Sequence, residues 1–181
     1  MGEVWEIMSG QLHFIHHAFN VRILAFVLMN NHFHSLVATP DANLDRAMAW
    51  FMRETSRWLT KSGNRINQTY GGRYFKSVIG SPIYYLNCYK YVYYNPVKAG
   101  LCLNVADYPY SSLSRLLGFR HLAFPLENDE TLFNDVEGTL AWLNRAPSDE
   151  NWSAIKRASR RSEFRLPRLE GRKHPLENDT L

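Results

Sequence analysis

The segment from Val21 to Ala38 constrains the fold more than any other part of the chain. It begins with the apolar run VRILAFVLM, continues through Asn30-Asn31 and ends with HFHSLVA. Two apolar runs separated by a short polar turn predict a β-hairpin, with strands at 21–29 and 32–38. On a strand, residues two apart point to the same face, so His32 and His34 would present two imidazoles side by side. This pattern predicts an antiparallel sheet that carries half of a metal site.

The residues around the hairpin predict helices that would cover it. Apolar residues three or four positions apart are typical of an amphipathic helix, and they predict one over residues 3–18. A second helix is predicted over 43–61 and a short strand over 74–79. A third helix is predicted over 82–94, and Pro96 is expected to end it. Together these elements predict an α+β domain.

The composition is that of a globular protein with a substantial core. Of the 181 residues, 45% are hydrophobic and 14% aromatic, which is enough for close packing. No apolar stretch reaches the roughly 20 residues of a membrane-spanning helix, and the N-terminus lacks the order of a signal peptide. The two cysteines, Cys88 and Cys102, form neither a disulfide framework nor a zinc pattern. We therefore expect a bacterial-type cytoplasmic protein with no membrane partner.

The charge changes sign in blocks along the chain. Residues 1–120 have a balance of +6, residues 121–153 a balance of −6 and residues 154–173 a balance of +6. Basic surfaces with many aromatic side chains suit a phosphate backbone with stackable bases. Each charge taken alone is explained as readily by solvation of the surface. The predicted divisions are a main domain at 1–118, an acidic linker with a helix at 119–153, and a basic tail at 154–181.

The sequence YVYYNP closes the third predicted helix and supplies a second set of candidate residues. Tyr91 and Asn95 are four positions apart, so on a helix their side chains share a face. Pro96 disfavours helical backbone at Asn95. An amide oxygen is a ligand for a hard divalent cation, so two imidazoles and one oxygen would leave positions for a phosphate oxygen and water. The pattern indicates a cation beside a tyrosine.

These residues also have plainer interpretations. Two histidines in one strand are more often a coincidence of surface or core than a metal site. Most tyrosines in such a run serve packing, and those with the same chemistry as Tyr91 are Tyr89, Tyr93 and Tyr94. A second group of histidines lies on the first predicted helix without a nearby acid, and we interpret it as surface rather than as ligands. Its members are His13, His16 and His17.

The segments VLMNNHFHSLV and YVYYNPVKAGL resemble the HUH motif and the tyrosine motif of single-tyrosine HUH transposases, in particular the REP-associated tyrosine transposases of bacteria. GGRYFKSVI and DYPYSSLSRLLG extend the resemblance over residues 3–118. It implies a ferredoxin-like (RRM-like) antiparallel sheet with helices packed on one face, followed by a helical, basic C-terminal extension. It also implies an enzyme that cuts and rejoins single-stranded DNA near hairpins, in association with the nucleoid.

The resemblance also implies roles for individual residues. His32 and His34 match the metal-binding pair, Asn95 the third ligand, and Tyr91 the nucleophile, which would form a 5′-phosphotyrosine link and release a 3′-hydroxyl. We expect Mg²⁺ as the cofactor, with Mn²⁺ as a substitute, because both retain phosphate and water oxygens as ligands. The basic residues expected to contact single-stranded or hairpin DNA are Arg73, Lys76, Lys90, Lys156, Arg157, Arg160 and Arg161.

The start of the chain departs from the resemblance. Family members of this kind begin with a β-strand that is central in the sheet, whereas this chain starts inside its first predicted helix, which leaves the strand with His32 and His34 an unpaired edge. An upstream start, a strand supplied by the second chain of a homodimer, or decay to weak activity would each explain this. The competing functions are a metal-dependent transposase, a domesticated DNA-hairpin-binding protein without catalysis, and a structural relic. The intact set of site residues argues against the relic.

Overall fold

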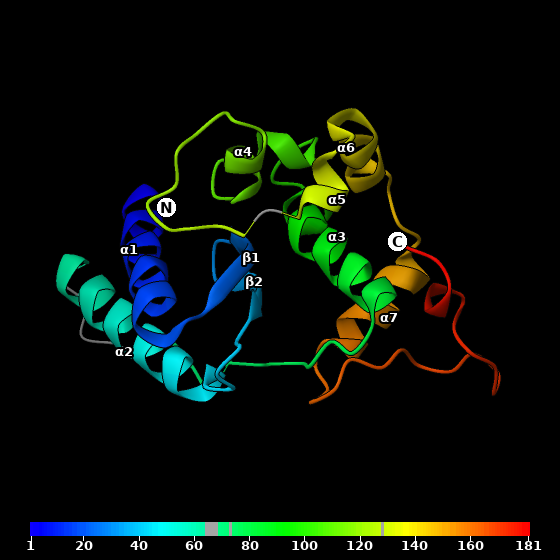
Figure 1. The fold of residues 1–181 in the computed structure, drawn as a ribbon, viewed down its shortest axis with the longest axis horizontal. Coiled ribbons are helices and arrows are strands. Elements are labelled where there is room, and N and C mark those ends of the chain that lie inside the picture. The colour runs from blue at the N-terminus through cyan, green and yellow to red at the C-terminus, as the bar shows by residue number, and fades with distance from the viewer. Residues whose placement is uncertain (64–68, 73, 128) are drawn as a thin grey trace.

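The computed structural model describes residues 1–63, 69–72, 74–127 and 129–181, and only the backbone of residues 130 and 131. A pair of strands lies between α1 and α2 on one side and α3 on the other (Figure 1). The elements up to the tyrosine motif are α1 (Gly2–Phe19), β1 (Arg22–Leu28), β2 (Phe33–Ala38), α2 (Leu44–Ser62) and α3 (Pro82–Lys98). The later elements are α4 (Leu113–Leu116), α5 (Glu130–Phe133), α6 (Val136–Asn144), α7 (Asp149–Ala158) and 3-10 turns at Val105–Asp107 and Pro175–Glu177. This is the α+β composition predicted. None of the helices in the described ranges is long and apolar enough to cross a membrane.

The predicted hairpin is present, and it sets the position of the two histidines. β1 and β2 pair antiparallel, with Val27 opposite His34. The Met29 N–H donates to the His32 carbonyl at 2.8 Å, which closes the turn. β2 begins at Phe33, so His32 belongs to the end of the turn and not, as predicted, to the strand.

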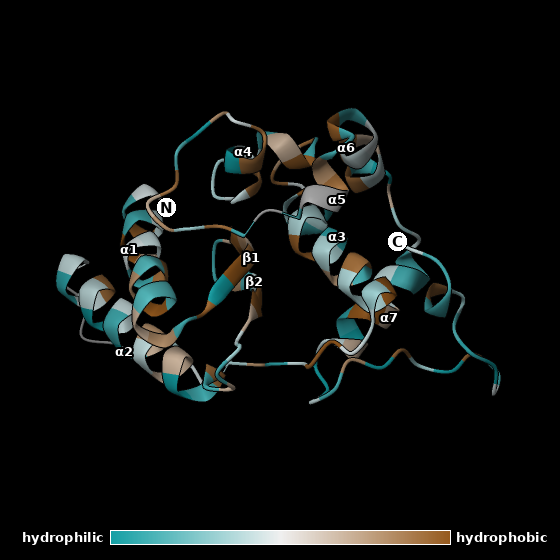
Figure 2. Cartoon of the chain, in the orientation of Figure 1, coloured by the Kyte–Doolittle hydropathy of each residue, from teal (hydrophilic) through white to brown (hydrophobic). Residues whose placement is uncertain are grey.

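β1 is apolar on both faces, and the structure covers both. Phe26 and Leu28 lie in the core that α1 and α2 form, whereas Ala25 and Val27 lie in the core around α3. Figure 2 shows β1 mostly in hydrophobic colours. The prediction of helices on one face of the sheet is therefore wrong. Beyond Arg22 the strand has no polar side chain, so neither face could be left to water.

The two outer edges of the hairpin differ. The Leu28 N–H donates to the Tyr110 carbonyl and the Ser112 N–H to the Phe26 carbonyl, both at 2.9 Å, so a short segment extends the sheet beside β1. The outer edge of β2 forms no backbone ladder with any described residue. The described residues thus form a two-stranded sheet, and the ferredoxin-like arrangement with a missing first strand stays a prediction.

The strand predicted over 74–79 is wrong. In the described part of this segment, only Val78 takes part in a bridge, and Phe75 and Val78 are 80% and 64% exposed. The segment is held instead by Asp45 of α2, whose carboxylate accepts hydrogen bonds from the Tyr74 hydroxyl and from Lys76 Nζ. Strand propensity depends on a neighbouring strand with which to pair, and among the described residues this segment forms only the isolated bridge between Val78 and Glu163.

α3 passes through Pro96 and ends at Lys98, so the prediction that the proline ends this helix is wrong. Ser81 caps its start, because the Ser81 Oγ accepts the Tyr84 N–H at 3.3 Å. A proline inside a helix removes one hydrogen bond and costs about 3 kcal/mol. Every residue from 87 to 94 is buried, so packing on all sides of α3 offsets that cost.

The residues after α3 close around it. α6 lies within the segment 119–153, for which a helix is predicted. Ile155, Phe164 and Leu176 are buried in the same core as α3, and the Leu181 N–H donates to Asn87 Oδ1 at 2.7 Å. The described residues of 154–181 thus contribute to the core. The predicted division into domain, linker and tail stays a prediction.

Candidate active site

His32 and His34 face each other at the start of β2. Their Nε2 atoms are 3.0 Å apart, and their rings meet almost at right angles, with centroids 4.8 Å apart and 86° between the planes. Two ring nitrogens at this distance share one proton, one as donor and the other as acceptor. A cation can replace that proton. In an octahedral ion, bonds of about 2.1 Å place adjacent ligands about 3.0 Å apart, which matches the spacing of the two nitrogens.

Asn31 selects which nitrogen of His32 points toward His34. The Nδ1 atom of His32 lies 2.6 Å from Asn31 Oδ1. An amide oxygen only accepts, so Nδ1 carries the hydrogen and Nε2 keeps a lone pair. Hydrogen bonds of this kind orient metal-binding histidines. From the sequence, Asn31 is predicted only as a turn residue, and the amide directly before HFH is the signal of this second role.

Desolvation and the charge of Lys156 favour the neutral form of both imidazoles, although His32 is exposed and His34 only partly buried. Desolvation is the main cause that lowers the pKa of His34 to about 4, and the charges of His32 and Lys156 lower it further. The pKa of His32 is also lowered, first by burial and then by Lys156. Neutral imidazoles offer lone pairs to a cation, whereas imidazolium ions would repel it.

Tyr91 is the tyrosine of α3 that reaches the histidines. Its ring centroid lies 5.4 Å from that of His34, with 82° between the planes, and the residue is 7% exposed. Burial raises the pKa of the Tyr91 phenol, while the charge of Arg160 and the amide of Asn95 oppose the rise. A phenol and two neutral imidazoles therefore meet at one place.

The neighbouring tyrosines take other positions. Tyr89 and Tyr93 are each 1% exposed, and their rings pack edge to face with centroids 4.9 Å apart. The Tyr94 ring packs against Trp152 at 5.7 Å. Within the described part of the chain, Tyr91 is the tyrosine whose ring meets a histidine of the pair.

Asn95 lies one turn beyond Tyr91 on α3. Its Nδ2 donates to the Tyr91 carbonyl at 2.6 Å, and its side chain is half-buried. Among the described residues, no hydrogen bond joins Asn95 to His32 or His34, and none is donated to its Oδ1. The structure thus brings His32, His34 and Tyr91 together and places Asn95 beside Tyr91, with an amide oxygen available as a ligand.

Two imidazoles do not complete the coordination sphere of a cation, so a metal site here would need oxygen donors as well. The described residues contain no cluster of three or more His, Cys, Asp or Glu side chains that could hold a metal ion. The histidine pair would need an amide oxygen, a phosphate oxygen or water to complete a coordination sphere. The residues present therefore offer a divalent cation two imidazole nitrogens at octahedral spacing, and one amide oxygen beside Tyr91.

Helix α7 contributes side chains that the sequence analysis did not place at the site. The Trp152 ring lies 4.5 Å from that of Tyr91, with 34° between the planes. Lys156 lowers the pKa of both histidines, and the charge of Arg160 acts on Tyr91. Trp152 and Lys156 are four positions apart on α7, so they share one face, and Arg160 follows two residues after the helix ends at Ala158. That spacing was the available signal, but only the packing of α7 against α3 shows where the face points.

The remaining residues predicted to bind DNA do not gather at one place. Lys76 is exposed and pairs with Asp45 at 2.6 Å. Arg157 and Arg161 are exposed, and Arg157 acts on His174, whose pKa is lowered mainly by burial. Arg73 lies outside the described residues.

Lys90 is buried, contrary to the expectation that it contacts DNA. Its Nζ donates to the main-chain oxygen of Leu181 at 2.8 Å and lies 5.6 Å from the centre of the Trp142 ring. Burial, with a smaller contribution from Arg145, lowers the pKa of Lys90 to about 8. Adjacent residues on a helix point about 100° apart. Because Tyr91 points toward the histidines, Lys90 points to a different side of α3, where the Leu181 main chain and Trp142 cover it.

Comparison with known proteins gives one match. The family model described as "Transposase IS200 like" matches residues 2–95, slightly more than half of the chain. The matched part includes His32, His34, Tyr91 and Asn95, and it ends before α7. No curated protein and no solved structure matches the chain. Because its motifs stand in the matched part and that part exceeds half of the sequence, the chain belongs to the IS200-like transposase family.

Proposed function

We propose that the protein is a metal-dependent single-stranded DNA endonuclease and strand transferase with Tyr91 as its nucleophile. A transposase-type activity follows from the family, and the mechanism and substrate are our proposal. The observation that carries it is the contact of Tyr91 with His34, 5.4 Å between ring centroids, beside a second imidazole whose Nε2 is 3.0 Å away from that of His34. A nucleophile thus adjoins two neutral side chains of the kind that bind metals.

The reaction is a transesterification. The Tyr91 phenol loses its proton to water, and its oxygen attacks a DNA phosphorus. The bond from that phosphorus to the 3′-oxygen of the preceding nucleotide breaks, and the 3′-oxygen takes up a proton from water. The products are a 5′-phosphotyrosine link and a free 3′-hydroxyl. The link conserves the ester, so a 3′-hydroxyl can later attack it and rejoin the DNA.

The side chains around Tyr91 have separate tasks in this reaction. His32, His34 and Asn95 would hold a divalent cation, which would neutralise charge on the phosphate. Lys156 and Arg160 place positive charge beside the same point, which favours the phenolate and the charge that builds on the phosphate. Trp152 covers one face of the Tyr91 ring and restricts its position.

The substrate that we propose is a single strand next to a DNA hairpin. The exposed Arg157 lies on α7, which reaches the site, and the exposed Arg161 follows shortly after the end of that helix, so both can hold a phosphate backbone close to the site. The open outer edge of β2 can accept a strand from a second copy of the chain, which would complete a ferredoxin-like sheet in a homodimer.

Covalent adduct formation tests the mechanism. A labelled oligonucleotide with a hairpin and a single-stranded flank is incubated with protein and Mg²⁺, or with Mn²⁺ as the substitute, and adducts are resolved in denaturing detergent gels. We expect an adduct with the natural chain, none with Tyr91→Phe, and none with chelator. The matched control is Tyr94→Phe, which removes a hydroxyl from the same helix. An adduct with Tyr91→Phe would exclude Tyr91 as the nucleophile.

A DNA-hairpin-binding protein without catalysis is the second candidate. It is favoured by the two-stranded sheet, whose β2 edge forms no ladder with the described residues. This function predicts hairpin binding that weakens steeply with salt, and no adduct with either cation. The same gels therefore separate the two candidates.

A further inference from the structure

A stripe of basic and aromatic side chains runs along the outer side of α2. Its members are Arg46, Trp50, Arg53, Arg57 and Lys61. Successive members are three or four positions apart, so all five lie on one face of the helix. The side chains of Arg53 and Arg57 are 63% and 76% exposed, and Arg46 and Lys61 are also exposed. The stripe is therefore accessible along its whole length.

Aromatic rings hold three of these cations in place. The Arg53 guanidinium lies 4.6 Å from the centre of the Trp50 ring, and that of Arg46 lies 5.8 Å from the centre of Phe19. Lys61 Nζ lies 5.3 Å from the centre of the Trp58 ring. Cations held over rings lose less freedom when they bind a phosphate, so the stripe is organised before any ligand arrives.

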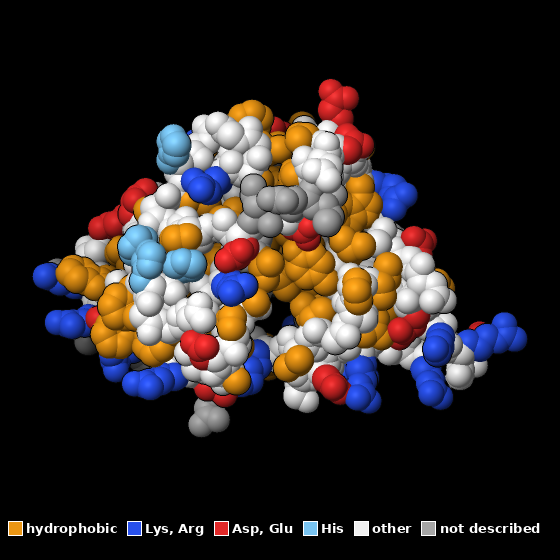
Figure 3. All heavy atoms as spheres, viewed as in Figure 1, with side chains coloured by type: hydrophobic (Ala, Val, Ile, Leu, Met, Phe, Trp, Pro, Cys, Tyr) orange, Lys and Arg blue, Asp and Glu red, His pale blue; other side chains and the backbone are white. Residues whose placement is uncertain are grey.

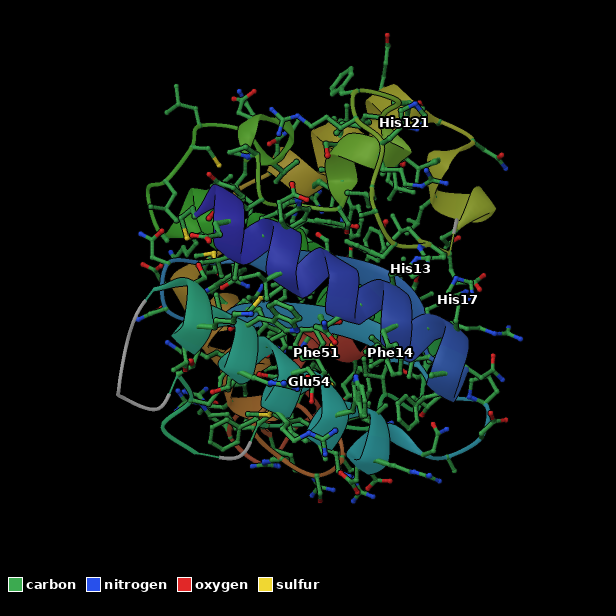
Figure 4. The ribbon with its side chains drawn as sticks, turned by 90° about the vertical axis from the view of Figure 1, so that its left-hand side faces the viewer. His13, Phe14, His17, Phe51, Glu54 and His121 are labelled. Atoms are coloured by element: carbon green, nitrogen blue, oxygen red, sulfur yellow. The ribbon has the colours of Figure 1, made fainter. Side chains whose placement is uncertain are left out.

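Two rings beside the stripe remain open to solvent. Phe14 of α1 stacks on Trp50 with 4.6 Å between centroids and 15° between the planes, and it is 40% exposed. Trp58 is 45% exposed. Figure 4 shows Phe14 between α1 and α2, and Figure 3 shows Lys and Arg side chains with hydrophobic side chains among them over α2. Exposed rings beside cations are the elements that single-stranded nucleic acids use for stacking.

The acids of α2 do not cancel this charge. Glu54 accepts a hydrogen bond from Arg53 at 3.0 Å and forms an ion pair with Arg57 at 3.6 Å, and its side chain is only 13% exposed. One largely buried carboxylate therefore pairs with two arginines. Each guanidinium has five N–H donors, so both arginines keep donors for a ligand. Asp45, the other acid of the helix, bonds to Tyr74 and Lys76.

The stripe lies away from the candidate active site. α1 and α2 pack on the face of β1 that carries Phe26 and Leu28, whereas α3 and Tyr91 pack on the opposite face. A strand on α2 is thus separated from Tyr91 by the sheet, and the stripe cannot be part of the set that His32, His34 and Tyr91 form.

We propose that the α2 stripe, with Phe14 and Trp58, is a second binding surface for single-stranded DNA that takes no part in the chemistry at Tyr91. From Arg46 to Lys61 the helix rises about 22 Å. A strand with the stacked rise of about 3.4 Å per nucleotide would place six or seven nucleotides along this length, and a more extended strand would place fewer. The surface engages phosphates through the cations and bases through the exposed rings, without reading sequence.

Binding without metal tests the proposal independently of the chemistry. Fluorescence anisotropy of a labelled oligothymidylate is measured with chelator at several salt concentrations, in a Tyr91→Phe background. The test variant is Arg46→Gln/Arg57→Gln/Lys61→Gln, which leaves Arg53 to pair with Glu54. Three lost phosphate contacts should make the slope of log K against log salt shallower by about 2.

Two further variants control this result. Arg22→Gln/Arg115→Gln/Arg120→Gln removes the same charge from exposed positions elsewhere and should retain the natural slope. Trp58→Leu should weaken binding about fivefold or more with little change of slope, because a stacking contact is lost and no charge. Circular dichroism checks that each variant is folded.

The outcomes separate this proposal from the proposed function. The proposed α2 surface would be contradicted if the α2 triple variant kept the natural affinity and salt slope. It would also be contradicted if the charge control lost as much affinity and slope as the α2 variant. Tighter binding of a duplex of the same length would overturn the assignment to single strands. Either result would leave adduct formation at Tyr91 unaffected, and a failed adduct assay would leave this surface standing.

Discussion

Helices α2 and α7 carry similar side chains in opposite surroundings. α7 has Trp152 and Lys156 on one face, with Arg160 two residues beyond its end, and α2 has a tryptophan and four cations on one face. Trp152 is 8% exposed and packs on Tyr91, so it brings Lys156 and Arg160 to the histidines and the phenol. The α2 cations lie beyond the other face of the sheet and point to solvent.

The difference shows that charge and aromatic content do not determine the role of a basic helix. Lys156 of α7 alters the pKa values of His32 and His34, and Arg160, just after α7, alters that of Tyr91, so both cations act on groups that we assign to the reaction. In the described part of the chain, the cations of α2 lie over aromatic rings or pair with Glu54. We therefore expect α7 to govern the rate of the chemical step and α2 to govern the capture of DNA.

The largest expected effect is on the chemical step. Lys156→Gln/Arg160→Gln should lower the rate of adduct formation at saturating DNA by about 10²-fold, since donors and charges at a reacting centre have effects of this size. Quench-flow sampling followed by denaturing gels measures this rate. The α2 triple variant should change it far less while weakening capture of the long strand. Equal rate losses in the two variants would mean that the helices do not differ in role.

The hairpin and the tyrosine helix were predictable because their signals are local. The apolar run and Asn30-Asn31 specify β1, the turn and β2 within a few residues, and helical spacing places Tyr91 and Asn95 one turn apart. The sequence RILAFVL also indicates that both faces of β1 are buried, because polar residues do not alternate with apolar ones along it. Pro96 within α3 was not predictable, because its cost is offset by packing from distant segments.

The rest of the site could not be predicted because it depends on contacts between distant residues. The spacing of Trp152 and Lys156 showed that they share a face, but nothing in the sequence showed that this face meets Tyr91. The burial of Lys90 depends on Leu181 and Trp142, which lie far along the chain. In both cases local spacing described the helix correctly and left its orientation open.

A pair of tryptophan substitutions tests the same contrast through stability. Trp152→Leu should lower the free energy of unfolding by about 2 kcal/mol, because a large buried ring is replaced by a smaller side chain. Trp58→Leu should lower it by less than about 0.5 kcal/mol, since Trp58 is 45% exposed. Urea denaturation measures both. Equal losses would show that Trp152 does not anchor α7 to the core.

The smallest expected effect concerns Lys90, a cation that lies next to Tyr91 in the sequence and is buried in the core. Its pKa in the folded protein is about 8, and in the unfolded chain it is near the usual 10.4. Between these values only the unfolded chain binds the proton, so the unfolding free energy rises with pH, by about 1 kcal/mol from about pH 8 to 9. In Lys90→Met this contribution should disappear, which urea denaturation at several pH values measures as a difference from the natural chain.

Binding of oligothymidylate to Lys90→Met should stay unchanged, in contrast to the α2 triple variant, because Lys90 has no access to DNA. A clear loss of binding in a folded Lys90→Met protein would place Lys90 among the DNA contacts after all and remove the distinction between buried and exposed cations.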